Sequence, residues 1–316
     1  MTDNQDMIHV ACCIDGNYVK YCTVMLTSLL ENNKDSDIMV HIIAESLNDD
    51  TRLVLASTVE GKYGQQLQFH FPAKELLADC KVDDDGYISI ATYYRIFLGS
   101  ILGDDVTKVI YLDCDLVVNG AIKNFWATDI SDVSVGCVED MWSGRPESYA
   151  RLHFSPEHLY FNAGVLLLNL EKMRADGFEK RAIDYLRLHV SELVLYDQDL
   201  LNALLHDDKK FIAHRWNVQD GFLRRRRVER MPADSLVKLE SELQHPVIIH
   251  YTGSKKPWHY KSQHPWKGLY FRYLDMTKWR GERPVMPLGY KLKLMTDALF
   301  RGCGLMKQKY LKFPEI

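Results

Sequence analysis

Apolar residues in the first part of the chain alternate between short continuous runs and helical spacing. Residues 8–14 and 38–43 are apolar runs typical of buried strands, and residues 18–32 between them carry apolar side chains at helical intervals. Residues 48–63 repeat the helical spacing, and residues 67–71 form a short alternating strand pattern. The pattern predicts a βαβ beginning, in which helices connect the strands of a parallel sheet.

The same alternation continues to residue 250. Further strands are expected at residues 109–112, 133–138, 164–168 and 246–250, and further helices at residues 91–102, 171–189 and 198–205. Strands that alternate with helices imply a mostly parallel sheet that is covered on both faces. Neither an internal repeat nor a linker rich in Pro, Gly and Ser marks a domain boundary.

The pattern changes after residue 257, where aromatic residues crowd together. Residues 290–313 then carry six basic side chains and a single acid, Asp297, among Leu, Met, Phe and Tyr. This composition predicts that residues 281–316 form a basic amphipathic extension of a domain spanning residues 1–280, able to contact an acceptor or an anionic membrane surface. A solvated helix packed on the protein's own body fits the same pattern. The aromatic residues are Trp258, Trp266, Tyr270, Phe271, Tyr273 and Trp279.

Size and charge limit the classes of protein to consider. The chain has 316 residues, which suits one large α/β unit with an appendage. Its net charge is -4, from 39 basic and 43 acidic residues. A nucleic-acid-binding protein would be expected to carry a basic excess, so we expect no nucleic-acid partner.

The cysteines and the N-terminal residues indicate the cellular compartment in which the protein is expected to work. The seven cysteines are odd in number and form no CxxC, which predicts reduced thiols. Residues 1–6 are polar and do not resemble a secretory signal, and no apolar run reaches the roughly 18 residues of a spanning helix. We therefore expect a cytoplasmic protein, which the basic extension would bring to the inner face of the membrane.

The strongest short motif is the pair Asp113 and Asp115, at the exit of the strand at residues 109–112. Side chains two residues apart on a strand point to the same side, and ligands of α/β sheets bind where strands end. Two neighbouring carboxylates repel each other unless a cation lies between them, and oxygen ligands suit Mg²⁺ or Mn²⁺. The motif predicts a divalent metal site, although two aspartates near a turn also occur by chance.

A second motif follows the apolar strand that ends at residue 250. His250 can complete the shell of a metal, and a mixed carboxylate and imidazole shell favours Mn²⁺ over Mg²⁺. Gly253 permits a close approach of the backbone, and Lys256 can neutralise a phosphate. Pro257 and Trp258 are expected to stiffen and bury this turn.

Together these motifs resemble glycosyltransferase family 8, the retaining transferases that include bacterial lipopolysaccharide galactosyl- and glucosyltransferases. Its D-x-D and H-x-x-G-x-x-K-P-W patterns are both complete here, and the resemblance covers about residues 7–280. It implies a GT-A fold, a Rossmann-like mixed α/β sheet flanked by helices. It also implies a metal-dependent hexosyltransferase that uses a UDP-sugar, UDP-galactose or UDP-glucose, and a glycan or lipid-linked saccharide acceptor. Further matching segments are residues 10–18, 92–95, 160–169 and 196–202.

The resemblance also assigns roles to single residues. Asp113, Asp115 and His250 would ligate the metal, with Cys114 between the carboxylates, while Gly253 and Lys256 would hold the diphosphate. Arg95 would reach the donor, as suits a guanidinium near phosphate or sugar hydroxyls, although a surface ion pair is its simpler role. The uridine would lie on Cys13, Ile14, Asp15 and Asn17.

The same resemblance implies which residues bind the donor sugar. Asn162 and Ala163 would line the donor sugar, Asp197 would hydrogen-bond its hydroxyls, and Gln198 would face the anomeric carbon from the far side. A neutral amide is a poor nucleophile, so we favour front-face transfer through an ion pair, with Lys256 and the metal stabilising the leaving diphosphate.

Three departures from the family pattern concern Cys114, Cys13 and the arginine run at residues 224–227. The thiol of Cys114 should point away from the metal, because neighbouring strand residues face opposite sides. Cys13 replaces a small apolar residue and is plausible beside uracil. The arginine run is typical of a solvated loop, or it contacts a phosphorylated acceptor or an anionic lipid.

Two other classes compete with this interpretation. Asp113 and Asp115 also fit the nucleophile and acid/base of haloacid-dehalogenase-type phosphatases, but that motif belongs to a first strand and leaves residues 250–258 unexplained. A non-catalytic sugar-nucleotide binding protein is the second alternative. Signatures of nicotinamide, P-loop and nucleophile-elbow enzymes are absent from the sequence.

Overall fold

The computed structural model describes residues 7–80, 90–229, 231 and 233–311. Its main element is a seven-stranded sheet in the order β3-β2-β1-β4-β7-β6-β8. The bounds are β1 Ile8–Cys13, β2 Ile38–Ile43, β3 Gln66–His70, β4 Lys108–Leu112, β6 Val135–Glu139, β7 Phe161–Asn169 and β8 Lys209–Phe211. β7 runs antiparallel to both of its neighbours, and the other pairs are parallel. This confirms the expected mixed and mostly parallel sheet.

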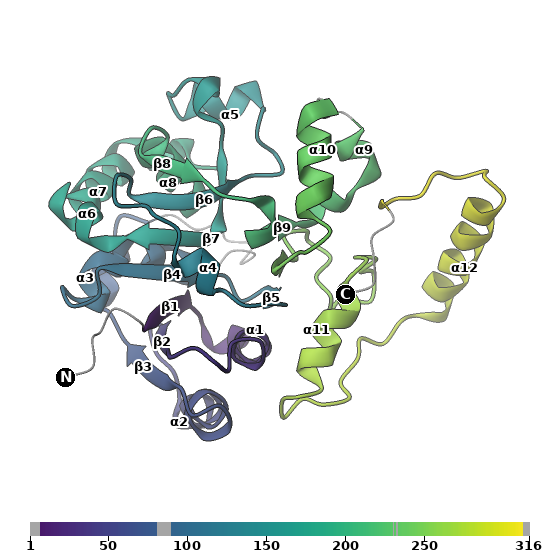
Figure 1. Cartoon of the computed structure of the whole chain (residues 1–316), viewed down its shortest axis with the longest axis horizontal. Coiled ribbons are helices and arrows are strands. Elements are labelled where there is room, and N and C mark those ends of the chain that lie inside the picture. Colours follow the sequence, from purple (N-terminus) through teal and green to yellow (C-terminus); the bar gives the residue numbers. More distant parts are fainter. Residues whose placement is uncertain (1–6, 81–89, 230, 232, 312–316) are drawn as a thin grey trace.

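Helices cover both faces of this sheet (Figure 1). Along β4 the side chains alternate, so that Tyr111 packs into one core cluster while Ile110 and Leu112 pack into the other. The first cluster lies under helices on the α3, α6, α7 and α8 side, and the second lies under α1 and α2. These helices are α1 Val19–Glu31, α2 Asp49–Ala56, α3 Leu98–Leu102, α6 Leu170–Ala175, α7 Phe178–His189 and α8 Tyr196–Leu205.

A second, three-stranded sheet was not expected from the sequence. It has the order β5-β10-β9, with bounds β5 Leu116–Val118, β9 Val218–Gln219 and β10 Ile248–His250. The expected strand at residues 246–250 is therefore real, but it lies outside the main sheet. β5 and β9 have three and two residues, too short to show a period in the sequence.

Two expected helices differ in their bounds. The helix expected at residues 171–189 is broken into α6 and α7, because Gly177 adopts a left-handed conformation with φ of 61°. The helix expected at residues 91–102 begins as 3₁₀ turns over Ile90–Phe97 and becomes α-helical only in α3. Four further helices of the described chain are α4 Lys123–Trp126, α5 Pro146–Arg151, α9 Arg225–Val228 and α10 Ala233–Glu242.

The C-terminal part contains α11, Lys267–Leu274, and α12, Leu288–Gly302. α11 packs on α1, where Asn32 donates a 2.7 Å hydrogen bond to the Tyr273 hydroxyl. α12 stands away from the body (Figure 1), and none of its residues, all of which the structure describes, is buried. Among the described residues, no helix is both long enough and apolar enough to cross a bilayer.

Candidate functional site

The pairing of β5 with β10 brings the two sequence motifs together. Leu116 lies opposite His250 in this antiparallel pair, and the Tyr251 N–H donates to the Asp115 carbonyl at 3.0 Å. His250 Nε2 consequently lies 3.0 Å from Asp115 Oδ1 and 3.7 Å from Asp113 Oδ2. One ligand atom from each of these three side chains lies within 4.8 Å of the other two. The geometry of the expected metal ligands thus arises from a contact between strands about 130 residues apart.

Asn217 fixes the orientation of the His250 ring. Its Oδ1 lies 3.0 Å from His250 Nδ1, while its Nδ2 donates to Asn162 Oδ1 at 2.9 Å. This arrangement makes Oδ1 the acceptor from an Nδ1–H group and turns Nε2 toward Asp115. A histidine that ligates a metal is usually held in this way by a second polar group.

Gly164 leaves the space in which the three ligands meet. A Cβ atom at this position would lie 2.2 Å from His250 Cε1 and 2.6 Å from Asp113 Oδ2, which no side chain can tolerate. The Gly164 carbonyl also accepts from the Asp113 N–H at 2.8 Å. The residues present therefore fit a divalent ion with oxygen and nitrogen ligands, and Gly164 shapes the site without ligating.

Buried cations compensate the two carboxylates. Arg95 Nη2 lies 3.0 Å from Asp113 Oδ1, and Lys256 Nζ forms an ion pair with Asp115. Burial opposes the ionisation of Asp115, but the charges of Lys256 and His250 outweigh it and hold the pKa of this carboxyl well below its ordinary value. This lowered pKa favours the ionised form of Asp115.

Arg95 also bridges to the sugar side of the site. Its Nε lies 2.9 Å from Asp197 Oδ2, but the Nε–H group donates to the Thr92 carbonyl, so the contact with Asp197 is an ion pair without a direct hydrogen bond. Burial raises the pKa of Asp197 to about 6, and the charge of Arg95 only partly offsets this effect. The guanidinium is 4.4 Å from the centre of the Tyr111 ring, which adds a cation–π contact.

Gln198 lies in a hydrogen-bonded group of neutral amides and one carboxyl. Its Oε1 accepts from the Ala163 N–H at 2.9 Å and from Asn162 Nδ2 at 3.1 Å. Its Nε2 donates to Asp140 Oδ2 at 3.3 Å, and Asn162 donates to the same oxygen. The backbone of Tyr196, at the start of α8, has a φ of 49°, an uncommon value for a residue with a side chain. Strained backbone of this kind often occurs at functional sites.

The loop expected to hold the uridine follows β1. Asp15 Oδ1 accepts from the Asn17 N–H at 2.8 Å and so caps the short 3₁₀ turn Gly16–Tyr18. Ile14 is 1% exposed and packs into the core, so it offers its backbone rather than its side chain to a ligand. Burial raises the pKa of the Cys13 thiol, and Arg95 and Asp113 are among its charged neighbours.

The comparisons with known proteins agree with this geometry. Residues 9–262 match the family model described as "Glycosyl transferase family 8". The chain belongs to this family. It is a glycosyltransferase of a retaining hexosyltransferase family, and this membership excludes the phosphatase alternative.

The family 8 relatives include enzymes and a stress protein. The chain is 29% identical over 284 residues to general stress protein A of Bacillus subtilis, covering 87% of this chain and 95% of the relative. It is 27% identical to a lipopolysaccharide 1,2-glucosyltransferase of Escherichia coli K12, over 89% of this chain and 82% of that enzyme. Its fold matches galactosyltransferase LgtC, solved with donor and acceptor sugar analogues, with a TM-score of 0.77 and 24% identity over 90% of this chain and all of LgtC. This last likeness confirms the expected GT-A fold.

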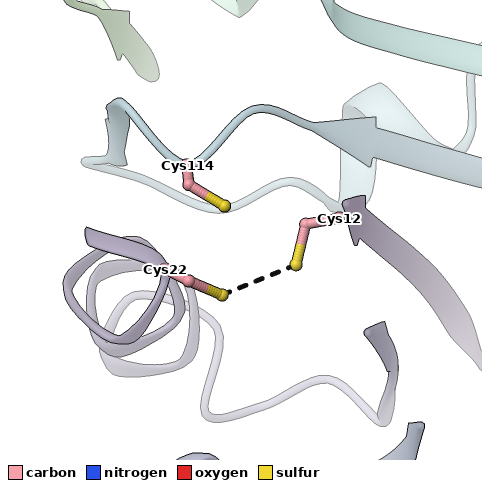
Figure 2. Close-up of side chains that lie close together, drawn as sticks. All are labelled: Cys12, Cys22 and Cys114. Atoms are coloured by element: carbon pink, nitrogen blue, oxygen red, sulfur yellow. Dashed lines mark hydrogen bonds between the residues drawn. The ribbon is translucent and has the colours of Figure 1, made fainter. Parts of the chain in front are cut away.

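In this family 8 transferase the side chain of Cys114 points away from the metal ligands. Figure 2 shows its thiol in the core beside Cys12 from β1 and Cys22 from α1, and the sulfur atoms of Cys12 and Cys22 are 3.7 Å apart. Any contact between Cys114 and a donor would therefore involve its backbone. The three cysteines belong to the core cluster that lies under α1 and α2.

The turn after His250 packs against α1. Lys256 Nζ donates to the Tyr251 carbonyl at 2.7 Å in addition to its ion pair with Asp115. The Trp258 ring stacks on the Tyr21 ring of α1, with the two ring centroids 3.9 Å apart. This stacking packs the turn against α1. Gly253 passes close to a neighbouring ion pair, because a Cβ there would lie 3.3 Å from Asp220 Oδ2.

Sequence reasoning did not select three residues that the structure brings into the site. Asp140 follows β6 at the same edge of the sheet as Asp113 follows β4, and this position after a strand was the available signal. Gly164 was noted only as part of a matching segment. Asn217 carries no local signal, because its role depends on contacts with distant residues.

Proposed function

We propose that this enzyme transfers galactose or glucose from a UDP-sugar to a hydroxyl group of a cell-surface glycan or lipopolysaccharide-type acceptor, with a divalent metal and with retention of configuration. The observation that carries the proposal is the convergence of Asp113, Asp115 and His250 around the space left by Gly164. Mn²⁺ fits this mixed set better than Mg²⁺, which prefers an octahedron of oxygens.

Asp113, Asp115 and His250 would hold the metal, which would neutralise the donor diphosphate and stabilise it as a leaving group. Lys256 forms an ion pair with Asp115, and its side chain is 15% exposed. It belongs, with Gly253, to the turn that would cradle the diphosphate. A diphosphate in this cradle would offer Lys256 a second anionic partner. Arg95 would orient Asp113.

Gln198 supports a mechanism without a covalent glycosyl-enzyme intermediate. Its amide oxygen is neutral and already accepts hydrogen bonds from Ala163 and Asn162, both of which withdraw electron density from it. We infer that the bond between the anomeric carbon and the phosphate oxygen breaks first. The acceptor oxygen then bonds to the same face of that carbon while its proton passes to an oxygen of the leaving diphosphate. Asn162, Ala163 and Asp197 would position the sugar.

We base the proposed hexose and the proposed acceptor on the names of the relatives. Two of them are named for transferring glucose or galactose to lipopolysaccharide. Residues 281–316, of which the structure describes residues 281–311, would form an extension that contacts the acceptor or the inner face of the membrane. In support, Leu288, Leu292, Met295 and Leu299 lie at positions i, i+4, i+7 and i+11 of α12, and each is more than half exposed.

A screen of nucleotide sugars tests the proposal. Release of UDP is measured with Mn²⁺ for UDP-galactose, UDP-glucose and sugars on other nucleotides, and NMR reads the anomeric configuration of the product. We expect turnover of one of the two named UDP-hexoses and a product whose configuration matches the donor. Turnover that does not depend on added Mn²⁺, or a product with inverted anomeric configuration, would contradict the proposal.

A further inference from the structure

The arginine run at residues 224–227 contacts the returning C-terminal segment. The Arg225 N–H donates to the Lys309 carbonyl at 3.1 Å, and the Leu311 N–H donates to the Leu223 carbonyl at 3.0 Å. These bonds form a short antiparallel bridge between Arg224 and Tyr310. After α12 the chain thus comes back to the body (Figure 1). Lys309 and Tyr310 there line one hollow together with Gly253 and Lys255 of the turn that follows His250.

A small hollow lies where these segments meet. Its lining includes Arg224, Gly253, Lys255, His264, Lys309 and Tyr310, and its volume is about 40 Å³. This volume accommodates about three water molecules, so the hollow suits one compact group and not a sugar ring. Gly253 belongs both to this hollow and to the turn proposed to cradle the diphosphate.

The hollow carries an excess of positive charge. Asp220 is its carboxylate, and both oxygens are engaged, Oδ2 by the Arg224 guanidinium and Oδ1 by the Tyr310 hydroxyl at 2.9 Å. Among the described residues, neither Lys255 nor Lys309 forms an ion pair within 4 Å. Burial and the charge of Arg224 lower the pKa of Lys309. An anion beside Lys309 would offset the repulsion between its ammonium group and the Arg224 guanidinium.

His264 adds an unused hydrogen-bond donor. It is 5% exposed, and its Nδ1 accepts from the Trp266 N–H at 3.2 Å. In the neutral ring the proton therefore belongs to Nε2, which is buried and has no hydrogen-bond partner among the described residues. Burial lowers the pKa of His264 to about 4, which keeps the ring neutral. A buried N–H without an acceptor is uncommon in proteins and is costly.

We propose that this hollow binds one phosphate group, held by Lys255, Lys309 and Arg224 and accepting a hydrogen bond from His264. The phosphate would belong to the acceptor or to the headgroup of the lipid that presents it. Because the hollow adjoins the Gly253 turn, a phosphate bound there would fix the acceptor beside the donor diphosphate. This role in acceptor binding rests on the proposed transferase function, whereas the binding of phosphate does not.

Calorimetric titration of inorganic phosphate into the full-length protein tests the site. Saturating UDP and Mg²⁺ are present, so that phosphate does not enter the diphosphate cradle. We expect one phosphate per chain, and Lys309→Gln should weaken its binding about tenfold, since a charge-assisted hydrogen bond is lost. Lys307→Gln removes the same charge two residues away and should leave binding unchanged. Absence of phosphate binding, or equal loss in both variants, would overturn the proposal.

Two further measurements separate this proposal from the transferase function and identify the source of the phosphate. Release of UDP from the donor in the absence of acceptor should be the same in Lys309→Gln and in the wild type. A loss of this activity in the variant would contradict a role confined to the acceptor. Sedimentation with phosphatidylglycerol vesicles, compared with phosphatidylcholine vesicles, is then repeated with excess inorganic phosphate. Release by phosphate would support a lipid headgroup as the source, and unchanged sedimentation would support a phosphate on the acceptor glycan.

Discussion

The proposed metal site and the C-terminal segment differ in how their charged side chains are paired. Around Asp113 and Asp115 every buried charge has a partner, since Arg95 and Lys256 face the carboxylates and Asn217 orients His250. In the C-terminal segment, Lys309 lies at the hollow without an ion pair among the described residues, and α12 buries none of its apolar side chains. Paired charges around a site favour a fixed geometry, whereas unpaired charges and exposed apolar faces mark surfaces that bind a partner.

The largest expected effect comes from breaking the paired centre. Asp115→Asn removes a proposed metal ligand and the partner of Lys256 while keeping the shape of the side chain. We expect UDP release from the donor to fall by at least about a hundredfold, as happens when a group that stabilises a developing charge is lost. The measurement is Mn²⁺-dependent turnover. Asp132→Asn, at an exposed aspartate, is the matched control, and equal turnover in the two variants would contradict the metal assignment.

Gly164→Ala tests whether the space between the ligands matters. The new methyl group would overlap His250 and Asp113, so we expect affinity for Mn²⁺ to fall by about ten- to a hundredfold, the usual consequence of displacing a ligand. Binding is measured by calorimetry on protein whose folding has been checked by circular dichroism. Gly268→Ala in α11 introduces the same methyl group into open space and should keep the wild-type affinity.

The difference between the regions also explains what the sequence could predict. The motifs around Asp113 and His250 are local and follow apolar strands, so their existence, the family and the α/β class could be recognised. Their convergence could not be derived, because it depends on the pairing of β5 with β10 across a long stretch of chain. The kink at Gly177 was also missed, since one glycine does not interrupt helical periodicity strongly enough.

His264 gives a pH test of the C-terminal hollow. Its pKa is about 4 in the folded protein and near 6.5 in the unfolded chain, so the unfolded chain binds more protons between these values. The contribution of the neutral His264 to the free energy of unfolding is therefore fully present above about pH 7 and is lost as the pH drops toward 4. At pH 5 the loss is about 2 kcal/mol relative to a protein without this group.

The measurement is the free energy of unfolding of the wild type and His264→Asn at pH 7 and pH 5. The wild type should lose more stability than the variant over this interval. Equal losses would show that His264 is not held neutral in the folded protein. His245→Asn, at an exposed histidine, is the control and should follow the wild type over this interval.

The smallest expected effect concerns the apolar face of α12, and it separates binding from stability. Leu292→Gln and Leu299→Gln should each weaken binding to anionic vesicles by about tenfold, because a leucine that enters a membrane contributes roughly 1.5 kcal/mol. Thermal stability and UDP release should not change, since both side chains are already exposed, at 55% and 65%. Leu188→Gln alters a still more exposed leucine, at 77%, on α7, on the opposite side of the molecule from α12 (Figure 1), and should leave vesicle binding intact. If the α12 variants instead lowered the unfolding temperature, this face would be packed on the protein's own body in solution.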